Sequence, residues 1–136
     1  MKIKWLSIGL VATTILVITA CSKLPNNVSA DASSSGKQVE VVVNGSITVT
    51  LDSNATTGYS WELTGISDTG VLQKTDNKYE APTSGLVGAG GKEVWTFQTL
   101  AAGTTTLSME YSQPWAGGQK AAKNFTLTII SKYAAK

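Results

Sequence analysis

The side chains that most enzymes use for catalysis are scarce in this chain of 136 residues. It contains no histidine, and its one cysteine lies at position 21. Without histidine, neither a Ser-His nor a Cys-His nucleophile pair can form, and histidine-ligated metal sites are excluded. The nine Asp and Glu residues occur singly, with no paired carboxylates for general acid–base catalysis. These residues therefore leave an enzyme possible but unsupported, and they indicate no catalytic residue, metal or cofactor.

Three segments of unusual composition contain the candidate binding residues. The first, NATTG at 54–58, combines a turn-forming asparagine with two threonines, and Gly58 is expected to adopt a positive φ. The second, PTSGLVGAGG at 82–91, is rich in glycine, which permits close approach of another surface. The third, QPWAGG at 113–118, contains Trp115, which either folds back onto the core or forms an exposed binding anchor. Taken alone, each segment is also compatible with an ordinary connection.

The rest of the chain has the pattern of short β-strands, which must position these segments. Residues 46–51 alternate strictly between polar and apolar, as is typical of a half-buried strand. Further strands are expected around 39–43, 59–63, 71–79 (at an edge), 95–97, 105–111 and 124–129. No long segment has helical periodicity. The sequence therefore predicts an all-β fold, an immunoglobulin-like antiparallel β-sandwich.

The order of the connections predicts where the three segments lie. The first link, Asn44-Gly45, is a hairpin signal. If the chain reverses at every link, alternate links fall at the same end of the sandwich. The second, fourth and sixth links are 52–58, 81–92 and 112–123, and they contain the three segments. We therefore expect one end of a rigid scaffold to present all three, as binding loops are presented in immunoglobulin-like domains.

The order Asn-x-Thr-Thr-Gly-Tyr, then Gly-x-Gly-Gly, then Pro-Trp resembles the chagasin family of cysteine-protease inhibitors, over about 38–133. The resemblance implies reversible, non-covalent inhibition of papain-like cysteine proteases by three loops that block the active-site cleft. It implies that Thr56 and Thr57 approach the catalytic cysteine, with the other two loops on either side. The implied protease-binding residues are Asn54, Thr56, Thr57, Gly58, Tyr59, Gly88, Gly90, Gly91, Gln113, Pro114 and Trp115.

Two positions depart from the family pattern. The family usually has proline where this chain has Ala55, and arginine where it has Gln113. The first change implies a less rigid loop, and the second removes a charge and a bidentate donor. Both imply reduced affinity or an altered range of targets. The alternative function is that of a cell-envelope module that uses the same loops to bind a glycan or another protein.

The N-terminus has the pattern of a secretion signal. Lys2 and Lys4 precede a mostly apolar stretch at 6–19, which is too short for a comfortable membrane span. The sequence ITAC at 18–21 resembles a bacterial lipobox, in which the cysteine is lipid-modified and becomes the first residue of the mature protein. We therefore expect a lipid on Cys21 and a protein that faces the periplasm or the exterior from the cell envelope.

The expected organisation is a lipoprotein signal peptide at 1–20, a flexible tether at 21–37 and a chagasin-like inhibitor domain at 38–136. Removal of Lys2 and Lys4 lowers the formal net charge from +2 to zero, with nine lysines against nine acidic residues. A neutral domain without a basic patch is not expected to bind nucleic acid. The expected partners are a papain-like cysteine protease and, through the lipid, a membrane; we expect a monomer.

Overall fold

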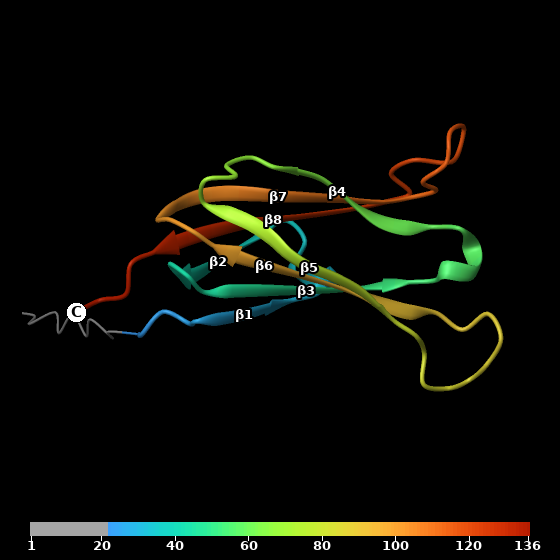
Figure 1. Ribbon diagram of the computed structural model, residues 1–136, viewed down its shortest axis with the longest axis horizontal. Helices are drawn as coiled ribbons and strands as arrows, with labels where there is room; N and C mark the ends of the chain where they lie inside the picture. The colour runs from blue at the N-terminus through green and yellow to red at the C-terminus, as the bar shows by residue number, and fades with distance from the viewer. Residues whose placement is uncertain (1–21) are drawn as a thin grey trace, which may run out of the picture.

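The computed structural model describes residues 22–136, which form two packed β-sheets (Figure 1). The strand order is β1-β3-β6-β5 in one sheet and β2-β8-β7-β4 in the other. The strands are β1 (Asn27–Ala30), β2 (Lys37–Val42), β3 (Ser46–Ser53), β4 (Ser60–Ile66), β5 (Leu72–Glu80), β6 (Gly91–Thr99), β7 (Gly103–Ser112) and β8 (Lys123–Lys132). The prediction of an all-β, immunoglobulin-like sandwich is confirmed. The expected signal peptide and Cys21 lie outside the described residues.

Strict alternation along the central strands builds the core between the sheets. In β3, β6, β7 and β8, buried and partly or fully exposed residues follow one another with a period of two. Phe97 of β6 and Phe125 of β8 are fully buried in the core, together with aliphatic residues such as Ile47 and Leu107. Each such side chain contributes about 1.5–3 kcal/mol through removal from water. This packing makes the sandwich a rigid support for its loops.

The three predicted loops lie at one end of the sandwich, as expected (Figure 1). Loop 1 (54–59) joins β3 to β4, loop 2 (81–90) joins β5 to β6, and loop 3 (113–122) joins β7 to β8. The C-terminus and the connections β2–β3, β4–β5 and β6–β7 lie at the opposite end. The strand at 71–79 was expected at an edge, and β5 is the edge strand of its sheet.

The prediction of a flexible tether at 21–37 is wrong for most of the residues that the structure describes in this range. β1 pairs in parallel with β3, in the register Asn27↔Ser46 to Ala30↔Val49. Ahead of this strand, the carbonyl of Pro25 accepts a hydrogen bond from the Val42 amide (3.1 Å). The segment is ordered because its backbone pairs with the edge of the sheet and because Val28 and Ala30 pack against the core. Within residues 22–136, no helix is both long enough and apolar enough to span a bilayer.

The turn at Asn44-Gly45 joins the two sheets and does not close a hairpin. β2 pairs in parallel with β8, and β3 pairs with β1 and β6, so the strands on either side of the turn are not partners. Asn44 adopts a positive φ of 65°, as the turn signal implies. The sequence therefore identified the turn correctly, but the predicted hairpin is wrong because pairing is decided by the partners that each strand finds elsewhere.

Candidate functional site

Loop 1 contains a short 3-10 turn, η2 (Ala55–Thr57), which Asn54 caps. The Asn54 side-chain oxygen accepts hydrogen bonds from the backbone amide (3.1 Å) and the hydroxyl (2.6 Å) of Thr56. The Thr57 hydroxyl donates to the Asn54 carbonyl (2.6 Å). Both threonines are exposed, yet their hydroxyls are engaged within the loop. The paired threonines therefore hold the turn in shape while their side chains remain at the surface.

Gly58 ends the turn in the left-handed conformation, with φ 79°. This confirms the predicted positive φ, which a residue with a Cβ adopts only at a cost. The structure adds a second reason for glycine: a Cβ at Gly58 would lie 2.5 Å from Cη2 of Trp115. The Trp115 ring of loop 3 therefore packs directly on the Gly58 backbone of loop 1.

Loop 2 is joined to loop 1 through a side chain. Nδ2 of Asn54 donates a hydrogen bond to the Gly88 carbonyl (3.0 Å). Gly85 and Gly88 both have positive φ, and a Cβ at either would meet nothing within 4 Å. These glycines are therefore needed for the path of the loop and not for close packing inside the protein.

Two exposed apolar side chains at the tip of loop 2 were missed by the sequence reasoning. Leu86 is 71% exposed, and Val87 is fully exposed. Apolar residues of this exposure within a glycine-rich loop favour contact with a partner. The sequence does contain a signal for them, because Leu86 and Val87 form an apolar pair between two glycines.

Gly91 does not lie on the binding surface. It is the first residue of β6 and is buried, and a Cβ there would lie 2.2 Å from the Glu80 carbonyl oxygen and 2.6 Å from the Tyr79 hydroxyl. Gly91 is therefore a packing residue at the base of loop 2, which corrects its expected role. Gly90, by contrast, is exposed and lies beside loop 1, since a Cβ there would be 3.8 Å from Cβ of Asn54.

Loop 3 presents its tryptophan to solvent. Trp115 is 51% exposed and Pro114 is exposed, so the ring does not fold back into the core between the sheets. Gln113 has an internal role: its side-chain oxygen accepts a hydrogen bond from the Gln119 amide (2.8 Å), and the two residues also share a backbone hydrogen bond. The Gln113 side chain therefore closes its own loop, where the family arginine would offer donors.

The aromatic residues beneath the loops connect loop 1 to loop 3. Tyr59 stacks on Tyr111 with ring centroids 5.3 Å apart, and its hydroxyl donates to the side-chain oxygen of Gln119. Together with the contacts of Asn54 and Trp115, this joins each outer loop to loop 1. The three loops thus form one connected surface.

A buried carboxylate lies under this end of the sandwich. Glu93 is 9% exposed, and its Oε2 accepts a hydrogen bond from the backbone amide of Trp61 in the opposite sheet (2.8 Å). Burial raises the pKa of the Glu93 carboxyl, although the hydrogen bond from Trp61 opposes this effect. Glu93 therefore ties the two sheets together close to the start of β4, which follows loop 1.

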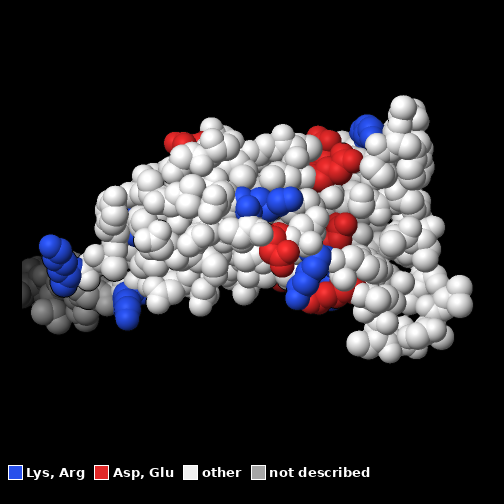
Figure 2. All heavy atoms as spheres, viewed as in Figure 1, with Lys and Arg blue, Asp and Glu red and all other residues white. Residues whose placement is uncertain are grey.

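The loop-bearing end is almost free of charged side chains (Figure 2). Across the three loops, Lys120 is the only charged residue. Just outside loop 1, Asp52 pairs with Lys92 (2.6 Å), and the hydrogen bond from Lys92 to Asp52 raises the pKa of Lys92. A surface of this kind binds through shape and apolar contact, with little electrostatic steering.

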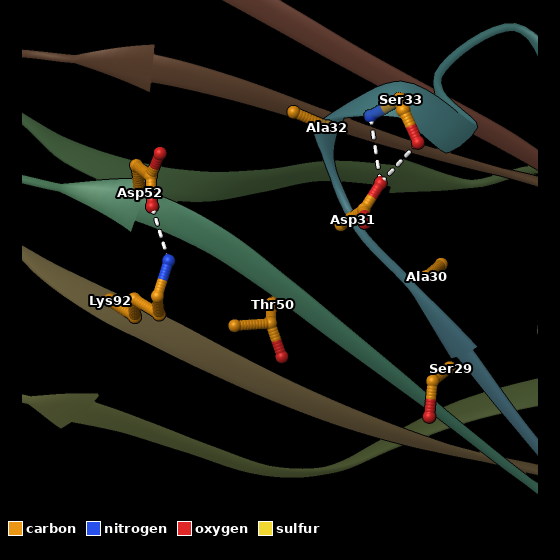
Figure 3. Close-up of a pocket in the computed structure, with 8 residues that line it drawn as sticks. All are labelled: Ser29, Ala30, Asp31, Ala32, Ser33, Thr50, Asp52 and Lys92. Atoms are coloured by element: carbon orange, nitrogen blue, oxygen red, sulfur yellow. Dashed lines mark hydrogen bonds and ion pairs between the residues drawn. The ribbon is translucent and has the colours of Figure 1, made fainter.

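An open hollow of about 560 Å³ is lined by residues of β1, the segment that follows it, β3 and β6 (Figure 3). Its charged side chains are already engaged: Asp52 pairs with Lys92, and Asp31 accepts hydrogen bonds from the amide and the hydroxyl of Ser33. These hydrogen bonds from Ser33 hold the pKa of Asp31 below its usual value. The charged side chains that line the hollow are therefore paired with one another or with Ser33.

The fold and the three linked loops define a binding protein of the loop-presenting β-sandwich class. Residues 40–129 match the model of the chagasin family of peptidase inhibitors, I42, and the chain belongs to this family. Chagasin of Trypanosoma cruzi is 34% identical over 97 residues, covering 69% of this chain and 88% of chagasin. Amoebiasin-2 of Entamoeba histolytica is 30% identical over 92 residues, covering 68% of this chain and 75% of the relative.

Solved structures share the fold. The cysteine protease inhibitor EhICP2 of Entamoeba histolytica superposes with a TM-score of 0.65 at 20% identity, covering 78% of this chain and 95% of that one. PbICP-C, solved in complex with falcipain-2, superposes with a TM-score of 0.54 at 17% identity, covering 82% and 92%. The resemblance inferred from the order of the three motifs is confirmed.

Proposed function

We propose that the protein is a reversible, non-covalent inhibitor of papain-like cysteine proteases that acts as a monomer and blocks the active-site cleft with its three loops. The observation that carries this proposal is the connected loop surface at one end of the sandwich, in a chain of the chagasin family. The names of its relatives support it: EhICP2 is a cysteine protease inhibitor, and PbICP-C forms a complex with falcipain-2.

In this proposal loop 1 enters the cleft and brings Thr56 and Thr57 to the catalytic cysteine. The backbone there is a 3-10 turn, so the nucleophile meets a compact turn and not an extended peptide. The threonine hydroxyls are held by Asn54, which leaves the turn little freedom to adapt to a productive geometry. The loop would therefore occupy the cleft without being cleaved.

The outer loops would fix how deeply loop 1 enters. Trp115 of loop 3 and the apolar tip of loop 2, Leu86 and Val87, are the exposed anchors on either side. An interface of this type buries about 800 Å² per partner. Because the loops are linked to one another before binding, little ordering entropy is lost when the complex forms.

Titration of papain with the purified protein tests the proposal. We expect inhibition at sub-micromolar concentration that is reversed by dilution, with the inhibitor recovered uncleaved. Leu86→Ser combined with Val87→Ser should weaken inhibition without loss of folding, whereas Tyr133→Ser, at the opposite end, should not. An envelope module for a glycan or another protein would leave papain fully active.

We also propose that a lipid on Cys21 anchors the protein in the cell envelope, facing the periplasm or the exterior. The polypeptide enters the fold at the end opposite the loops, where Pro25 and Asn26 bond to β2 and to the start of β3. An anchor there would point the loops away from the membrane. Several acyl chains, at about 0.8 kcal/mol per buried CH₂, make attachment stable. Cys21→Ala should give unprocessed or soluble protein, and wild-type protein that carries no lipid mass would refute the anchor.

A further inference from the structure

Tyr111 is a buried tyrosine at the end of β7, just before loop 3, and it is absent from the residues expected to bind the protease. It is 7% exposed. Its hydroxyl accepts a hydrogen bond from the backbone amide of Asn54 (2.9 Å), the first residue of loop 1. Because the side chain is buried and its hydroxyl is bonded to Asn54, we expect the hydroxyl to affect binding through Asn54 and not by direct contact.

The Tyr111 ring also contacts the other end of loop 1. It stacks on Tyr59, the last residue of that loop, at 5.3 Å between centroids, and packs at 5.2 Å against Trp61, its cross-strand neighbour. The first and the last residue of loop 1 therefore both contact the Tyr111 side chain. Few small displacements of the loop leave both contacts intact.

Loop 3 closes on the same residue. The Tyr111 carbonyl accepts a hydrogen bond from the amide of Ala122, the last residue of loop 3 (2.9 Å). Lys123, which follows, places its Nζ 5.2 Å from the centre of the Tyr111 ring. Tyr111 thus holds both ends of loop 1 and the closing end of loop 3.

Asn54 passes this constraint to the rest of the surface. Its side chain caps η2 and bonds Thr56, and it also donates to Gly88 of loop 2. A cap of this kind works only while its backbone is held at the right angle to the turn. We propose that the Tyr111 hydroxyl is a positioning group that fixes Asn54, and through it loops 1 and 2, in the conformation that binds the protease; this rests on the proposed function.

A positioning role has a kinetic signature that a contact role lacks. Loss of the hydroxyl lowers the fraction of free molecules whose loops are competent to bind, which weakens the apparent affinity by that fraction. The loss falls on the association rate, because the complex, once formed, still holds the loops. Removal of a contact residue mainly speeds dissociation.

The test compares Tyr111→Phe, which keeps the buried ring, with Tyr133→Phe, which removes an exposed hydroxyl at the opposite end. The purified protein in detergent is used throughout. Three quantities are measured: the exchange rate of the Asn54 amide hydrogen in the free protein by NMR, the association and dissociation rates with papain, and the melting temperature. The exchange rate requires no protease, so it tests the loop contact independently of the proposed function.

For Tyr111→Phe we expect Asn54 exchange to be faster, and association with papain slower, by about twofold to tenfold, the range that one hydrogen bond supplies. The dissociation rate should be unchanged, and Tyr133→Phe should match wild type in all three measurements. Unchanged Asn54 exchange and unchanged association would overturn the proposal. Faster dissociation at an unchanged association rate would also overturn it. If wild type fails to inhibit papain, the proposed function falls, while the exchange result still decides whether Tyr111 fixes loop 1.

Discussion

Replacement of Ala55 by proline should tighten inhibition, because the local backbone already has the geometry that proline requires. Ala55 is the first residue of η2, a position that favours proline. The preceding residue, Asn54, is extended (φ −119°, ψ 97°) and so lies outside the α region that a following proline disfavours. In the part of the chain that the structure describes, the Ala55 amide donates no hydrogen bond, so none is lost.

The magnitude follows from the freedom that proline removes. At a compatible site, replacement by proline stabilises the folded conformation by about 0.4–1 kcal/mol. At 1.4 kcal/mol per tenfold, this corresponds to roughly twofold to fivefold in affinity. The upper value applies if free loop 1 often leaves its binding conformation. Ala55→Gly, which adds freedom at the same position, is the matched control and should weaken inhibition.

The assay is the inhibition constant for papain of the three proteins, with melting temperatures to verify folding. The expected order of affinity is proline, then alanine, then glycine. Weaker inhibition by a fully folded Ala55→Pro variant would show that loop 1 binds in another conformation than the one described. Equal inhibition constants for all three would show that the rigidity of loop 1 does not limit binding.

The remaining predictions concern the other loops and the buried carboxylate. Trp115→Ala should weaken papain inhibition roughly 30-fold, from about 2 kcal/mol for a central anchor, with little change in melting temperature. Gly58→Val should abolish tight inhibition and cost about 1–3 kcal/mol of stability, because the new side chain meets the Trp115 ring at a positive φ; full inhibition by a folded variant would contradict this. Gln113→Arg should give little gain in affinity, since any new contact is offset by loss of the hydrogen bond to Gln119, and a large gain would refute the internal role of Gln113. Because burial raises the pKa of Glu93, the fold binds its proton more tightly than the unfolded chain, and stability from this group falls as pH rises through that pKa. Glu93→Gln should therefore be at least as stable as wild type at neutral pH. Its melting temperature should also change less between neutral pH and mild acid, because the variant has no carboxyl at this position to titrate.

The sandwich and its loop-bearing end could be predicted because both depend on local patterns. Alternation such as that of 46–51 specifies a strand and its buried face, and reversal at each link then places loops 1, 2 and 3 together. The pairing of β1 with β3 could not be predicted. The alternation of its four residues, with Val28 and Ala30 against the core, is too short to identify a strand within a polar segment.

Within the site, residue types were easier to predict than roles. The positive φ of Gly58 followed from the turn, but the Trp115 ring that also requires a glycine there lies far away in the sequence. Gln113 was interpreted by comparison with the family arginine, and its bond to Gln119 appears only once loop 3 is folded. Tyr111 occupies a buried position in the alternating pattern of its strand, like any core residue. The hydrogen bond between its hydroxyl and the Asn54 amide therefore could not be predicted from the sequence.

Reversible inhibition of a papain-like cysteine protease by the three loops can be measured by titrating papain with the purified protein and following hydrolysis of a peptide substrate. We expect saturable, stoichiometric inhibition with a sub-micromolar constant, full recovery of papain activity on dilution, and no cleavage within residues 54–59. Full papain activity in the presence of micromolar folded protein, or inhibition that ends with cleavage of loop 1, would contradict this expectation.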